Sequence, residues 1–126
     1  MRSNVLTITS FVFLLITISL SSCKNKIVVP TVTTDEVSGI TYKSANCGGT
    51  VVSDGEDQLV ARGICWSSKQ NPTINDFTTS EAIHKGPYFS TMSDLKSYST
   101  YYVRAYASNS VGVGYGQEKT FTTSPK

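Results

Sequence analysis

The chain divides into one long apolar run and a remainder in which short apolar and polar segments alternate. Residues 5–20 are almost all apolar or small, and a short polar start containing Arg2 precedes them. From about residue 37, brief runs rich in Val, Ile, Thr and Tyr are separated by clusters of Gly, Asn, Asp and Ser. No long stretch of this remainder has the 3.6-residue period of a helix. The pattern therefore predicts an all-β domain behind an N-terminal apolar segment.

Alternation and turn residues predict where the strands lie. In the run at residues 44–51, alternate positions share one face, namely Ala45, Cys47, Gly49 and Val51. Asp54-Gly55 follows this run, and such a pair between two alternating runs is a signal for a hairpin. The returning strand is predicted at residues 59–66. Further strands are predicted at residues 88–92, 101–107 and 119–123, the last one after a turn rich in glycine.

The apolar run has the length and the flanks of a secretory signal peptide. It ends in Leu20-Ser21-Ser22-Cys23, which resembles the bacterial lipobox. That resemblance implies cleavage before Cys23 and acylation of this cysteine, and several acyl chains together hold a protein on a membrane for long times. Two alternatives are open: a plain signal peptide in which Cys23 is incidental, and a short membrane-spanning helix, for which about 20 apolar residues are needed.

The lipobox defines the expected domain boundaries and location. We expect a signal peptide at residues 1–22, a lipidated N-terminus and tether at residues 23–36, and one β-sandwich at residues 37–126. The protein would be held by lipid at the bacterial outer membrane, and the sequence leaves open whether it faces the periplasm or the cell surface. The expected mature chain has ten basic and nine acidic side chains and no block of like charge, so nucleic acid is not an expected partner.

The segment from Leu95 to Asn109 carries a family resemblance. Tyr101 lies six residues after Leu95 and begins an alternating run that continues to Ala107. This arrangement resembles the E–F corner and F strand of fibronectin type III domains, in which a buried tyrosine hydroxyl bonds a nearby backbone group. Together with Gly48-Gly49 and the run from Arg62 to Ser67, it is similar to fibronectin type III-like repeats of exported lipoproteins of Gram-negative bacteria over about residues 30–123.

The resemblance implies an immunoglobulin-like, two-sheet antiparallel β-sandwich. One departure from the family matters for the core. The tryptophan that the family places in its second strand aligns near Gly49, so that the core of this chain must be filled from elsewhere.

Residues suited to catalysis or metal binding are sparse. His84 is the single histidine and stands in a polar loop, so a Ser-His-Asp triad or a histidine metal site would have to be built around it alone. Cys47 and Cys65 supply two metal ligands at most, which is fewer than a structural zinc site needs. We therefore interpret the chain as non-catalytic, with no cofactor and no metal.

Cys47 and Cys65 form an even pair if Cys23 is acylated, in a compartment that permits disulfides. Cys47 lies seven positions before Asp54 and Cys65 ten positions after Gly55, which places them at similar heights on facing parts of the sandwich. A disulfide between Cys47 and Cys65 is predicted. Two free buried cysteines that act as small hydrophobic residues are the alternative.

The orientation of the strand at residues 59–66 decides the candidate binding surface. If Cys65 points inward, six side chains of two neighbouring strands form an exposed strip, and this strip is the predicted contact surface for a partner: Arg62, Ile64, Trp66, Tyr102, Arg104 and Tyr106. Tyr, Trp and Arg dominate the energetics of protein interfaces. In the opposite orientation Trp66 fills the volume missing at Gly49, and the strip shrinks to tyrosines that only cover the sheet.

The predicted function is that of a non-catalytic binding or spacer module of the cell envelope. Its expected partners are the membrane, through the lipid on Cys23, and an envelope protein or glycan that the sequence does not identify. One alternative is a subunit of a surface fibre, which needs an open strand edge. Another is a small inhibitor or enzyme-accessory protein that acts through its loops.

Overall fold

The computed structural model describes residues 26–126, and the predicted signal peptide, lipobox and Cys23 lie outside the described residues. The described part contains eight strands, which are β1 (Thr31–Thr34), β2 (Ala45–Ser53), β3 (Ala61–Ser67), β4 (Phe77–Thr78), β5 (Gly86–Met92), β6 (Thr100–Ser108), β7 (Val113–Tyr115) and β8 (Lys119–Thr122). Within residues 26–126, no helix has the length and apolar character that crossing a membrane requires.

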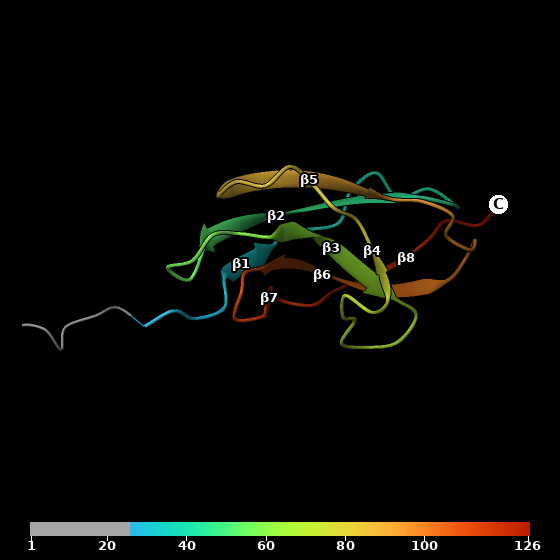
Figure 1. The fold of residues 1–126 in the computed structure, drawn as a ribbon. Coiled ribbons are helices and arrows are strands. Elements are labelled where there is room, and N and C mark those ends of the chain that lie inside the picture. The colour runs from blue at the N-terminus through green and yellow to red at the C-terminus, as the bar shows by residue number, and fades with distance from the viewer. Residues whose placement is uncertain (1–25) are drawn as a thin grey trace, which may run out of the picture.

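The strands form two antiparallel sheets that pack face to face (Figure 1). The first sheet has the order β1-β2-β5, and the second has the order β4-β3-β6-β7, with β8 also pairing with β6. This arrangement confirms the predicted two-sheet β-sandwich. The strands predicted at residues 44–51, 59–66, 88–92, 101–107 and 119–123 are present with small shifts at their ends.

The connection between β2 and β3 differs from the prediction. Because these strands belong to opposite sheets, Asp54-Gly55 crosses from one sheet to the other, and the predicted hairpin is wrong. Gly55 has a φ of +75°, and a Cβ atom there would lie 1.9 Å from the carbonyl oxygen of Val28. The side-chain amide of Asn109 donates to the carbonyls of Val28 (2.7 Å) and Asp54 (2.9 Å). These two bonds hold the β2–β3 connection against the segment that precedes β1.

The sandwich also begins earlier than residue 37. β1 lies inside the segment expected to be a tether, and it pairs with β2 from Thr31 to Thr34. Thr34 contributes to the second sheet as well, since its Oγ1 accepts the backbone N–H of Ala105 at 3.0 Å. The last part of the expected tether, residues 31–34, therefore belongs to the folded domain.

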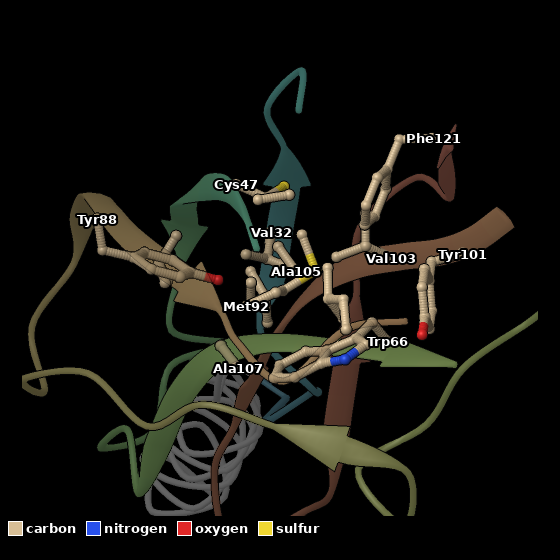
Figure 2. Close-up of a cluster of buried hydrophobic side chains, with 14 of the residues drawn as sticks. Val32, Cys47, Trp66, Tyr88, Met92, Tyr101, Val103, Ala105, Ala107 and Phe121 are labelled. Atoms are coloured by element: carbon tan, nitrogen blue, oxygen red, sulfur yellow. The ribbon is translucent and has the colours of Figure 1, made fainter. Parts of the chain in front are cut away.

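The core lies between the sheets and is shown in Figure 2. The alternate positions of β6 point inward as predicted, and so do the small and apolar positions of β2, among them Tyr101, Val103, Ala105, Ala107, Ala45, Cys47 and Val51. The predicted tyrosine corner is confirmed, because the Tyr101 hydroxyl accepts the backbone N–H of Lys96 at 2.9 Å. This bond fixes the β5–β6 connection against the end of the core.

The volume opposite Gly49 is filled by β5 and β6. A Cβ atom at Gly49 would lie 2.7 Å from the Cβ of Ala105 and 3.0 Å from the hydroxyl oxygen of Tyr88. The Tyr88 hydroxyl is buried and donates to the carbonyl of Gly63 at 2.7 Å, and burial raises the pKa of this phenol. Tyr88 and Ala105 thus fill the space beside Gly49.

Candidate functional site

The register between β3 and β6 decides which face of β3 is buried. Ile64 lies opposite Ala105, and Trp66 lies opposite Val103. Residues directly opposite each other in an antiparallel pair point to the same face. Ile64 and Trp66 therefore point into the core, where their exposed fractions are 0% and 7%. The prediction that they belong to an exposed strip is wrong.

Arg62 lies on the same inward face of β3, at the end of the core near Tyr88. It is only 2% exposed, and its guanidinium carbon lies 4.7 Å from the centre of the Tyr88 ring. Its Nε donates to the carbonyl of Ala82 at 2.5 Å, and one terminal nitrogen lies 2.9 Å from Nε2 of His84. Arg62 therefore closes one end of the core instead of offering a contact surface.

The outer face of β3 and β6 is covered by the chain itself. Tyr106 is 6% exposed, and its hydroxyl donates to the carbonyl of Thr79 at 2.6 Å. Arg104 is half-buried, with its guanidinium 4.1 Å from the centre of the Tyr115 ring and its Nε donating to the carbonyl of Pro72 at 2.6 Å. Tyr102 is also half-buried. The predicted strip is therefore not a free surface, because residues 70–82 lie over much of it.

The predicted disulfide is absent, and both Cys47 and Cys65 are free and buried. Cys47 points into the core, while Cys65 points to the outer face of the second sheet, where its Sγ lies 3.6 Å from the carbonyl oxygen of Pro72. The two sulfur atoms thus lie on opposite sides of that sheet. Burial raises the pKa of Cys47 to about 12 and that of Cys65 to about 11. Both thiols stay protonated at neutral pH, a state that disfavours reaction.

A pocket of about 400 Å³ opens at the end of the sandwich where β3 ends and β6 begins. We call it the distal groove, and it is lined by Trp66, Ser67, Ser68, Phe77, Ser93, Asp94, Leu95, Lys96 and Tyr101. Its volume lies in the range of small-ligand sites, roughly 300–1,000 Å³. Figure 1 shows that the loops that form it lie at the same end as the C-terminus, opposite the entry of residues 26–30.

Phe77 and Trp66 form the aromatic wall of the distal groove. The two rings stack, with their centroids 5.9 Å apart and their planes inclined by 22°. Phe77 is 67% exposed, whereas Trp66 is almost fully buried. A large exposed ring held in place by a buried one is a rigid apolar surface, and it is the kind of feature that marks interaction sites.

The indole N–H of Trp66 makes no hydrogen bond to any described residue. Every fully enclosed side-chain nitrogen and oxygen within residues 26–126 has a partner. The unpaired indole nitrogen is therefore not fully enclosed, and it belongs to a side chain that lines the groove. Figure 2 shows the nitrogen edge of Trp66 turned toward the side where Tyr101 lies. The groove thus contains a buried side chain with a donor that a ligand can use.

Asp94 and Lys96 supply the charges of the distal groove, and their charges are opposite. Asp94 has a φ of +58°, a conformation that Asp and Asn adopt more readily than most residues. The β5–β6 connection that carries both residues is bonded to the segment before β2, since the backbone N–H of Leu95 donates to the carbonyl of Lys43 at 2.9 Å. In the described part of the chain, no group of three or more His, Cys, Asp or Glu residues is placed to hold a metal ion.

Sequence reasoning did not identify the distal groove. Of the six residues of the predicted strip, Trp66 alone lines it. One signal in the sequence was available: Phe77 is a large apolar residue within a polar stretch between two strands.

Comparisons with known proteins support the fold. No protein-family model and no curated protein matches the chain. Among solved structures, the sensor domain of the anti-sigma factor RsgI4 of Pseudobacteroides cellulosolvens is similar, with a TM-score of 0.60, 19% identity, and coverage of 80% of this chain and 100% of that one.

Human fibronectin type III domains are similar in the same way. The domain of KIAA0970 gives a TM-score of 0.53 with 18% identity, covering 75% of this chain and 74% of that one. The third fibronectin type III domain of KIAA0343 gives a TM-score of 0.51 with 15% identity, covering 82% of this chain and 90% of that one. The fold is fibronectin type III-like. At these identities the likeness shows a shared fold, so function must be argued from the site.

Proposed function

We propose that this protein is a non-catalytic binding module of the bacterial envelope, anchored by lipid at Cys23, that holds its ligand in the distal groove. The observation that carries the proposal is the groove itself. It combines an exposed aromatic ring, an unpaired indole N–H and two opposite charges at one end of a rigid sandwich.

The position of the groove suits a lipid anchor at the other end of the domain. Val28 is bound to Gly55 at the end opposite the groove, since its backbone N–H donates to the Gly55 carbonyl at 3.0 Å. The five residue-to-residue steps from Cys23 to Val28 span at most about 18 Å. The strand β2 has nine residues, which corresponds to about 30 Å of length between the two ends. An anchored domain would therefore present the groove away from the membrane.

A fibre subunit is the second candidate, and one observation favours it. β5 forms an edge of the first sheet, with β2 as its partner among the described strands. Such an edge accepts an added strand in principle. Fibre subunits that take a donor strand also need a gap in their core, whereas the core of this domain is filled by side chains of its own β1, β2, β3, β5, β6 and β8. We therefore favour the binding module.

The anchor is tested by fractionating cells that express the chain or its Cys23→Ala variant. We expect the unchanged chain in the outer membrane and the variant in the soluble fraction. An equally membrane-bound variant would show that Cys23 is not the anchor.

Binding is tested with the full chain purified in detergent, using the fluorescence of its one tryptophan, Trp66. The chain is mixed with separated envelope fractions, namely peptidoglycan, lipopolysaccharide and outer-membrane proteins, and the emission of each fraction alone is subtracted. We expect at least one fraction to change the Trp66 emission, and Phe77→Ala to abolish the change. Unchanged emission with every fraction would leave a spacer and overturn the binding proposal.

A further inference from the structure

The distal groove has a chemistry that narrows the class of its ligand. We infer that it binds an uncharged sugar ring of a glycan, with Phe77 as the stacking surface and the indole N–H of Trp66 as a hydrogen-bond donor to a ring hydroxyl. This inference rests on the proposed binding function and adds the ligand class to it.

The stacking surface is one face of the Phe77 ring. The opposite face packs on Trp66 with the centroids 5.9 Å apart, which fixes the orientation of the ring. With 67% of Phe77 exposed, a free ring surface remains beside the pocket. The face of an aromatic ring is electron-rich, and it attracts the weakly positive C–H groups that line one side of a pyranose ring.

The polar groups of the groove suit hydroxyls, which both donate and accept hydrogen bonds. The Trp66 N–H is a donor only, the Asp94 carboxylate is an acceptor only, and the serine hydroxyls do both. All three kinds of group line the same pocket. Since the charges of Asp94 and Lys96 are opposite, the groove carries no excess charge to select an ionic ligand.

A peptide bound as an added strand fits this site less well. Strand addition needs a row of free backbone groups along a strand edge. Phe77 belongs to β4, which has two residues, and the rest of the groove is formed mainly by the loops that follow β3 and β5. The site is therefore a pocket at the end of the sandwich, and it offers side chains more than backbone.

The test uses the full chain in micelles of a detergent without a sugar headgroup. Nitrogen-15 labelling gives one indole N–H resonance, because the chain has one tryptophan. The probes are neutral oligosaccharides of glucose and of N-acetylglucosamine, a uronic acid oligosaccharide, and a proline-rich peptide. We expect a neutral oligosaccharide to shift the indole resonance in a saturable way, while the uronic acid oligosaccharide and the peptide leave it in place.

Two phenylalanines of similar exposure provide a matched control. Phe77 is 67% exposed in the groove, and Phe89 is 62% exposed on the other sheet. Phe77→Ala should weaken sugar binding at least tenfold, and Phe89→Ala should leave it unchanged. A shift caused by the peptide and by no sugar would overturn the sugar inference and leave the binding module standing. If no probe shifts the indole resonance but an envelope fraction still changes the Trp66 emission, the sugar inference alone fails. If no envelope fraction changes the Trp66 emission either, the proposed binding function fails as well.

Discussion

Trp66 and Phe77 are stacked partners that lie opposite each other in the β3–β4 pair, one inside the core and the other at its surface. The pair joins the part of the domain that determines stability to the part proposed to bind. Substituting each residue separately should therefore distinguish a loss of stability from a loss of binding.

Trp66→Ala should lower the free energy of unfolding by about 3–5 kcal/mol, because it leaves a cavity in the core. Phe77→Ala should cost only about 1 kcal/mol, the worth of an aromatic pair at an exposed position. Urea unfolding followed by circular dichroism measures both values, with Phe89→Ala as the exposed control. Equal costs at the two positions would contradict the assignment of Trp66 to the core.

The thiols should be unreactive in the folded protein. Cys47 is enclosed between the sheets, and Cys65 is covered by the loop that contains Pro72. Reducing agent should leave the melting temperature unchanged, and an alkylating reagent should modify both residues far more slowly in the folded protein than after denaturant is added. A lower melting temperature on reduction would indicate the disulfide that the structure does not contain.

Stability should fall as the pH rises above 9. Burial raises the pKa values of Cys47 and Cys65 from 9.0 to about 12 and about 11, so the unfolded chain loses these protons first and is favoured by alkaline pH. The loss should reach about 1 kcal/mol for each thiol by pH 10. Urea unfolding at pH 8 and pH 10 measures the fall, which should be smaller in the Cys47→Ala variant. An identical fall in that variant would rule out a contribution from Cys47.

Arg62→Lys should destabilise the domain by about 2 kcal/mol, although the charge is kept. A lysine has no planar fork to reach the carbonyls of Ala82 and Gly86 together, and it stacks less well on the ring of Tyr88. Arg104→Lys, at a half-buried position, should cost about half as much. Thermal unfolding of the two variants compares the costs, and the reverse order would contradict the burial of Arg62.

The sequence predicted β6 well and β3 poorly, and the reason is physical. In β6 the inward positions from Tyr101 to Ala107 are uniformly apolar, so that the alternation has a single solution. In β3 neither face is uniformly apolar. One face contains the charged Arg62, and the other contains Gly63, which has no side chain to bury. Only the register with β6 decides between the faces, and register depends on contacts that are distant in sequence.

The distal groove could not be predicted for a related reason. It forms where Phe77, the end of β3, the β5–β6 connection and the start of β6 meet, and its lining residues are up to 35 residues apart in the chain. The tyrosine corner was predictable because Leu95, Lys96 and Tyr101 are close in sequence. The predicted binding strip failed for two reasons: its β3 residues point into the core, and the segment after Ser67 covers much of the face that carries its β6 residues.

Because Cys47 and Cys65 are buried in different places, their reactivity can report two different opening motions of the domain. Cys65 becomes accessible when the loop over it lifts, whereas Cys47 becomes accessible when the sheets separate. The alkylation rate of each thiol, divided by its rate in the unfolded chain, gives the equilibrium constant for the corresponding opening. Two time courses on one unaltered sample would therefore distinguish breathing of the surface loop from unfolding of the whole sandwich.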